Sequence, residues 1–133
     1  MRLAVLAFVS SFLLASGAGA AEKFKQEHPG EVALLQQDDG SFAYRSFPNG
    51  AWLYIFDGDV PGKLGCVDNC MLRWPPVWAR AESKPTGDWT IVERDNGRRQ
   101  WAYKGHPAYV RFHDSLTTPT GVGAEPEWRL LTP

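Results

Sequence analysis

The pattern of hydrophobic and polar positions changes along the chain. Leu3 to Leu14 is almost wholly apolar, and Ala15 to Ala21 contains only small residues. From Ser41 onward, short aromatic and apolar runs alternate with polar residues and are separated by Gly, Pro, Asn and Asp, as is typical of β-strands joined by turns. No segment keeps the 3.6-residue period of a helix over three turns, so we expect an all-β protein with little helix.

Short strands are predicted where these runs occur, at 32–35, 41–47, 51–56, 89–94, 98–103, 108–112 and 128–131. Pro48-Asn49-Gly50 and Asp95-Asn96-Gly97 are strong turn signals. In the run 51–56 the two-residue period places Trp52, Tyr54 and Phe56 on one face. Residues 70–74 could form one helical turn, which Pro75-Pro76 would end.

The chain also repeats itself, because residues 38–59 align with residues 95–115. The matched positions are Gly50 with Gly105, Tyr54 with Tyr109, Asp59 with Asp114 and, further on, Trp74 with Trp128. One such unit has a single apolar face and could not fold alone. We therefore predict a single domain over 38–133, made of two β-meander repeats (about 38–78 and about 92–131) that pack with approximate internal two-fold symmetry. A leader with a first short strand, 21–37, precedes it.

The N-terminus predicts a secretory signal peptide over residues 1–20. Arg2 precedes the apolar run, and Ala18-Gly19-Ala20 fits the small-residue rule for cleavage. The run is shorter than the roughly 20 residues that a lasting membrane anchor needs, so we expect no stable membrane insertion. The mature protein would begin at Ala21 and be periplasmic or secreted.

Charge and size narrow the choice of partners. Without Arg2 the mature chain has 13 of the 14 Lys and Arg residues and all 15 Asp and Glu residues, which gives a net charge of about −2. No basic stripe could neutralise phosphates, so a nucleic-acid partner is not expected. A mature chain of about 113 residues is the usual size of one domain, and we expect a monomer.

Cys66 and Cys70 are the two cysteines of the chain. In an oxidising compartment an even pair favours a disulfide, and a separation of four residues allows one. The alternative is thiol redox chemistry or Cu(I) binding, in which Cys66, Cys70 and Met71 supply soft ligands together with a distant histidine: His28, His106 or His113.

The aromatic residues fall into two groups. Those of the repeat pattern are expected in the core, where aromatic rings suit a small β-domain: Tyr54, Phe56, Trp74, Trp101, Tyr109 and Trp128. Trp52, Trp78 and Trp89 lie outside the pattern and beside irregular segments. These three are the candidate ligand-binding residues, as a stacking platform for a sugar, flavin, haem or peptide.

Asp59 and Asp114 recur at matched positions after a strand. They could cap the following loops by accepting hydrogen bonds from backbone N–H groups. Alternatively, they could meet across the two-fold axis as paired carboxylates for acid–base or metal chemistry, as in a hydrolase.

Several of these residues carry a family resemblance. Tyr54-x-Phe56-x-x-Asp59, Cys66-x3-Cys70-x3-Trp74-Pro75-Pro76 and the second-copy residues Trp101, Tyr109, Asp114 and Trp128 resemble the bacterial "secreted repeat" family of predicted lipoproteins with a Yx(F/W/Y)xxD motif. The resemblance covers roughly 38–131 and implies the repeat, but no activity.

The chain departs from the family pattern in three ways. No cysteine lies near the cleavage site for lipid attachment, and the second copy has no cysteine pair. Arg111 stands where the second copy of the motif has an aromatic residue. We expect a bulge or one-residue slip to bring the adjacent Phe112 into that place.

No nucleophile motif, nucleotide fingerprint or histidine spacing for a metal occurs in the chain. The sequence therefore favours an exported, non-catalytic module without a cofactor that binds an envelope or secreted protein or a small ligand. A copper or thiol-redox protein using Cys66 and Cys70 and a hydrolase-like enzyme using Asp59 and Asp114 are the alternatives.

Overall fold

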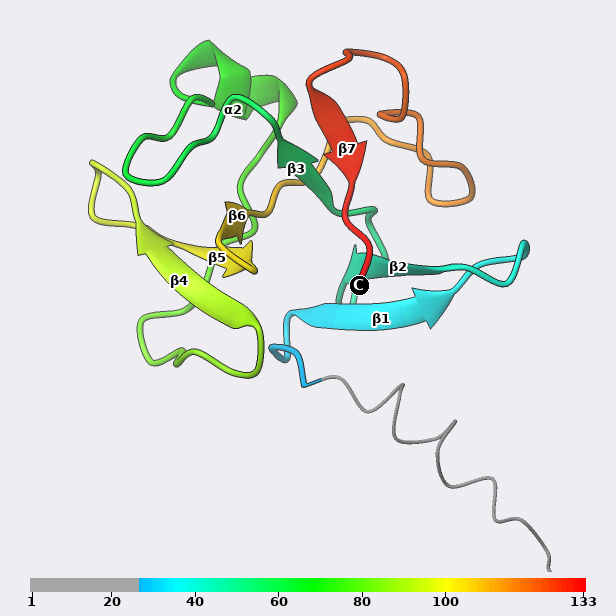
Figure 1. The fold of residues 1–133 in the computed structure, drawn as a ribbon, viewed down its shortest axis with the longest axis horizontal. Helices are drawn as coiled ribbons and strands as arrows, with labels where there is room; N and C mark the ends of the chain where they lie inside the picture. The colour runs from blue at the N-terminus through cyan, green and yellow to red at the C-terminus, as the bar shows by residue number, and fades with distance from the viewer. Residues whose placement is uncertain (1–26) are drawn as a thin grey trace, which may run out of the picture.

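The structure, a computed structural model, describes residues 27–133, and the predicted signal peptide lies outside this range. Three small antiparallel sheets form the fold (Figure 1): β1 (Val32–Gln36) with β2 (Phe42–Ser46), β3 (Tyr54–Phe56) with β7 (Trp128–Leu130), and β4 (Trp89–Glu93) with β5 (Arg99–Tyr103) and β6 (His106–Pro107). One short helix, α2 (Asn69–Arg73), follows the first long loop. The all-β prediction is confirmed. Within 27–133 no helix is long and apolar enough to cross a membrane.

The two hairpins β1–β2 and β4–β5 are built alike. Each pairs five residues on each strand, and corresponding pairs, such as Val32 with Ser46 and Trp89 with Tyr103, lie 57 positions apart. Their turns also match. Asp39 Oδ1 accepts from the Ser41 N–H and Asn96 Oδ1 from the Arg98 N–H, at 2.9 Å in both. The glycine between each pair has a positive φ, 84° at Gly40 and 77° at Gly97, a conformation that suits glycine.

The centre of the fold is the contact between Tyr54 and Tyr109. The N–H of each donates to the carbonyl of the other, at 2.8 Å and 2.9 Å. Backbone hydrogen bonds on either side occur in matched pairs: Leu131 to Leu53 with Val77 to Ala108, and Asp57 to Glu127 with Phe112 to Arg73, all at 2.8–2.9 Å. The members of each pair are 54 or 55 positions apart, the same offsets at which the sequence repeats.

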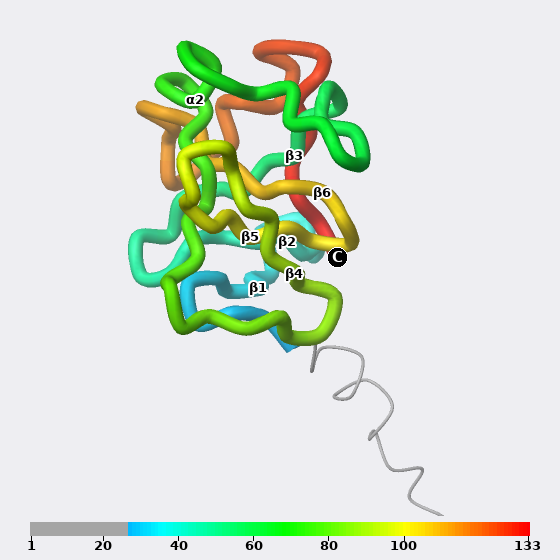
Figure 2. Tube along the Cα trace, turned by 90° about the vertical axis from the view of Figure 1, so that its left-hand side faces the viewer, coloured from blue at the N-terminus to red at the C-terminus, as the bar shows by residue number. Residues whose placement is uncertain are grey.

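Two hydrophobic clusters fill the interior. The first packs between the two hairpins and includes Tyr44, Leu53, Trp89, Trp101 and Tyr103. The second surrounds the central tyrosines and includes Trp52, Tyr54, Cys66, Trp74, Tyr109 and Trp128. The loops 57–73 and 112–127 lie together at the end of the molecule away from the β1–β2 hairpin, and the first of them lies beside the turn of the β4–β5 hairpin (Figures 1 and 2).

The prediction that residues 108–112 form the third strand of the second meander was wrong. Only His106 and Pro107 pair with β5, and the chain then crosses to Tyr54 and to Pro76 through isolated bridges at Tyr109. The chain leaves the sheet because the backbone of Tyr109 bonds to the other half of the molecule. Alternation of side chains within one segment does not encode that partner.

Candidate functional site

Asp59 holds the first loop and also the second half of the molecule. Its Oδ1 accepts from the backbone N–H groups of Gly65 (2.6 Å) and Cys66 (3.3 Å). Its Oδ2 accepts from the Tyr109 hydroxyl at 2.6 Å. The expected loop cap is therefore present, together with a bond to a tyrosine 50 positions away.

Asp114 makes the corresponding contacts in the second loop. Its Oδ2 accepts from the Tyr54 hydroxyl at 2.6 Å, and its Oδ1 accepts from the Thr120 N–H at 2.9 Å. The Tyr54 oxygen in turn accepts from the Gly121 N–H at 3.1 Å. Among the described residues no hydrogen bond joins Asp59 to Asp114, because each carboxylate is held by the tyrosine of the other half.

The two tyrosines remain protonated so that they can donate these bonds. Burial raises the pKa of Tyr54 and of Tyr109 well above the ordinary value of a tyrosine, and the hydrogen-bonded carboxylate raises it further. The Tyr-x-x-x-x-Asp spacing occurs twice in the sequence, but it gives no sign that each tyrosine bonds the aspartate of the other copy.

A column of three stacked rings lies between the loops. Phe56 stacks on Trp128, and Trp128 on Trp74, with ring centroids 4.6 Å and 3.9 Å apart. The Arg111 guanidinium lies over the Trp74 ring at the longer distance of 5.7 Å from its centre. The expected shift of Phe112 into this place was wrong, because Phe112 is 60% exposed and Arg111 itself occupies the position. A cation within about 6 Å of an aromatic ring centre is attracted to the ring, so Arg111 can contact Trp74 without a bulge.

The three tryptophans expected to form a ligand platform lie in different places. Trp52 and Trp89 are buried in the two core clusters, with 3% and 0% exposure, so neither ring offers a face to a ligand. Trp78 is half-buried, and the Arg98 guanidinium lies 3.6 Å from its ring centre. The structure does not bring the three together at one open surface.

Cys66 and Cys70 form the predicted disulfide, with the Cα atoms 5.2 Å apart. It closes the loop just before α2, and Cys66 is fully buried. The Cys66 carbonyl accepts a hydrogen bond from Arg94, and Arg94 also donates to Gln100 Oε1 at 2.7 Å. The stapled loop is thus fixed to the second hairpin by a buried guanidinium.

Arg94 was missed by the sequence analysis. It is 5% exposed, and within residues 27–133 it forms no ion pair with a carboxylate. A charged group this deep is costly unless hydrogen bonds compensate, and here Gln100, the Cys66 carbonyl and the more distant Tyr109 hydroxyl (3.5 Å) supply them. Only the folded arrangement distinguishes it from the exposed arginines around it.

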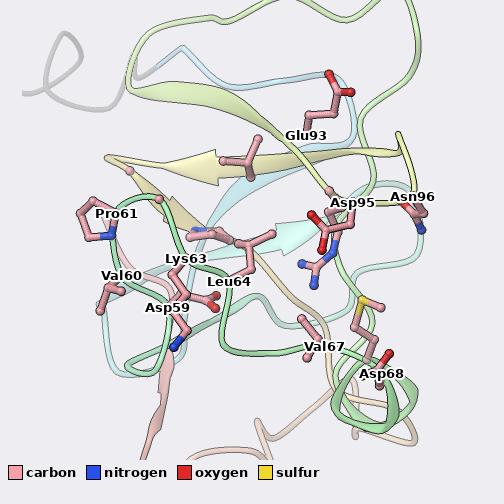
Figure 3. Close-up of a pocket in the computed structure, with 16 residues that line it drawn as sticks. Asp59, Val60, Pro61, Lys63, Leu64, Val67, Asp68, Glu93, Asp95 and Asn96 are labelled. Carbon is pink, nitrogen blue, oxygen red and sulfur yellow. The ribbon is translucent and has the colours of Figure 1, made fainter.

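A cleft of about 670 Å³ lies between this loop and the turn of the second hairpin (Figure 3). The loop contributes Asp59, Leu64, Val67, Asp68 and Met71, and the hairpin contributes Val92, Arg94 and Asp95. A cleft of this size suits a small ligand, for which typical volumes are about 300–1,000 Å³. No local pattern in the sequence indicates this cleft, since its walls come from segments about 30 residues apart.

The residues considered for copper are separated or already bonded. Cys66 and Cys70 are joined to each other, and Met71 lines the cleft. His106 and His113 are exposed, and the His28 ring contacts the carbonyl of Pro29. In the part of the chain that the structure describes, no group of three or more His, Cys, Asp or Glu could hold a metal ion.

Comparison with known proteins found no protein family, no curated protein and no solved structure that matches this chain.

Proposed function

We propose that this protein is an exported, non-catalytic binding module whose ligand occupies the cleft between the stapled loop and the second hairpin. The observation that carries the proposal is the difference between the two halves. Matched contacts maintain the fold in both halves. Of the two loops, however, only the first carries the disulfide, accepts the Arg94 hydrogen bond and lines the cleft. Features that the second loop does without are the best candidates for a task beyond folding.

The matched contacts also support the interpretation of the domain as two copies of one unit. The hairpins, the Tyr–Asp bonds, the loop caps and the stacked tryptophans all occur in pairs at offsets of 54 to 57 positions. We propose an internal duplication with approximate two-fold symmetry, in keeping with the resemblance to the secreted-repeat family.

The roles of the candidate catalytic residues favour binding over chemistry. Asp59 and Asp114 each accept several hydrogen bonds that hold a loop in place. A carboxylate engaged in this way would have to give up structural bonds to act as a general base. These structural roles disfavour the hydrolase alternative.

A pair of matched valines provides the test. Val67 lines the cleft, and Val122, 55 positions later in the second loop, lies outside its lining, while both are exposed. We expect small-molecule binders found by NMR screening of the mature protein to shift the amide signals of Lys63, Val92 and Asn96. Val67→Tyr should fill the cleft and abolish these shifts, whereas Val122→Tyr should leave them unchanged.

Two results would oppose the proposal. One is a broad screen of small ligands and envelope proteins that finds no binder. The other is a binder whose affinity falls with Val122→Tyr but not with Val67→Tyr, because it would place the site on the second loop.

A further inference from the structure

The charges that line the cleft are unbalanced. Asp68, Glu93 and Asp95 are exposed, and within residues 27–133 none of the three forms an ion pair. Asp59 is the remaining acidic residue of the lining, and Arg94 is its buried basic residue. The Tyr109 hydroxyl links the two, because it donates to Asp59 and accepts from Arg94. Lys63 is the other lining base, so one free ammonium faces three free carboxylates.

Apolar side chains lie among these carboxylates. Leu64, Val67 and Met71 come from the loop, and Val92 comes from the hairpin. Val67 is 44% exposed although the loop around it is closed by a disulfide and anchored by Arg94. Figure 3 shows Leu64 on the loop and Asp95 on the hairpin turn. An occupant would therefore meet hydrocarbon and carboxylate at the same time.

The lining also restricts the kind of cation. None of the lining residues is aromatic. Quaternary ammonium groups are usually held against aromatic faces, whereas a primary ammonium donates hydrogen bonds to carboxylates. The cleft fits the second kind.

We propose that the cleft binds a small organic cation, a primary amine on an alkyl chain, with its ammonium at Asp95 and its hydrocarbon over Leu64 and Val67. This inference rests on the proposed function and adds the chemical class of the ligand. The same carboxylates repel an anion of equal length. A neutral chain gains only the apolar contact.

Three probes of equal length separate these contributions: 1,8-diaminooctane, 1,8-octanediol and octanedioate. Titrated calorimetrically into the mature protein at low salt, the diamine should bind most tightly, the diol more weakly and the diacid least. Added salt should lower the affinity for the diamine and leave the affinity for the diol unchanged, because mobile ions screen exposed charges.

Two matched aspartates test the position of the ammonium. Asp95 follows Arg94 in the turn of the second hairpin, and Asp38 occupies the corresponding place in the first hairpin, away from the cleft. Asp95→Asn should lower the affinity for the diamine about two- to fivefold, the range of an exposed ion pair, and leave the affinity for the diol unchanged. Asp38→Asn should change neither. Because both residues are exposed turn positions, both variants should keep the native circular dichroism spectrum.

The outcomes distinguish the ligand class from the proposed function. If the diol or the diacid binds at least as tightly as the diamine and Val67→Tyr abolishes that binding, the ligand is not a cation. The proposal that the cleft is a binding site is then still supported. If the diamine binds equally well to wild type, Asp95→Asn and Val67→Tyr, it binds elsewhere and the inference fails. If none of the probes binds at millimolar concentration, the inference also fails, and the wider screen alone decides the proposed function.

Discussion

The hydroxyl of Tyr54 offers the sharpest test of how the two halves are held together. Tyr54→Phe removes the hydroxyl and keeps the ring, whose edge-on contact with Trp74 has a centroid separation of 5.2 Å. The change deletes the 2.6 Å bond to Asp114 and leaves the buried N–H of Gly121 without its acceptor. A hydrogen bond to a charged group contributes about 1.5–3 kcal/mol, and an unsatisfied buried donor costs about 1–3 kcal/mol.

Since these costs overlap, we expect the free energy of unfolding to fall by about 3 kcal/mol. That is a large share of the roughly 5–15 kcal/mol typical of a folded domain. Urea unfolding followed by tryptophan fluorescence and by circular dichroism measures the change. Thr132→Val, which removes an exposed hydroxyl near the C-terminus, serves as the control and should shift the midpoint little.

A double-mutant cycle with Asp114→Asn then isolates the bond itself. If Tyr54 and Asp114 interact as described, the double variant loses less stability than the two single changes added together. A loss of less than about 0.5 kcal/mol for Tyr54→Phe, the range of an ordinary surface change, would refute the reasoning.

Three further predictions concern the same core. Burial and then the bonded carboxylates raise the pKa of Tyr54 and Tyr109, so the folded state favours their protonated form. The stabilisation of the folded state that results should be complete below the unfolded pKa of about 10 and be lost as pH rises above it. Urea unfolding from about pH 8 to about pH 11 measures this loss. Gly121→Ala should destabilise by about 1–3 kcal/mol, because the new Cβ would lie 2.6 Å from the Tyr54 ring and 2.9 Å from the Trp74 ring. Arg111→Ala should cost about 0.5–1 kcal/mol through loss of the guanidinium over Trp74, and Arg111→Phe should recover it, both read from the urea midpoint.

Each of these has a result that would count against it. For the alkaline loss, it is a Tyr109→Phe protein with the same slope of stability against pH as wild type. For the glycine, it is a Gly121→Ala midpoint equal to that of Gly30→Ala, where nothing lies within 4 Å of the added Cβ. For the stacked column, it is an Arg111→Phe protein that is less stable than Arg111→Ala.

Local features of the chain were enough to predict much of the fold. The two-residue alternation and the Asp-Asn-Gly and Pro-Asn-Gly turns predicted most of the strands, because pleating and turn geometry depend on neighbouring residues. The Cys66–Cys70 disulfide was predictable from an even cysteine pair, a separation that allows the bond and the expected oxidising compartment. Sequence positions matched at offsets of 54 or 55 make corresponding contacts in the structure, although the sequence does not indicate what those contacts are.

Tertiary structure decided everything that depends on how the halves meet. Tyr54 donates its hydroxyl hydrogen bond to Asp114 rather than to Asp59, which is nearer in the sequence. The guanidinium of Arg111 lies over Trp74 where the motif has an aromatic residue. Arg94 becomes a buried anchor, and Trp52 and Trp89 become core residues. The cleft is also decided at this level. The partner of a side chain 50 or more positions away is set by the packing of whole units. Local alternation records which face of a strand is buried but does not record what that face is buried against.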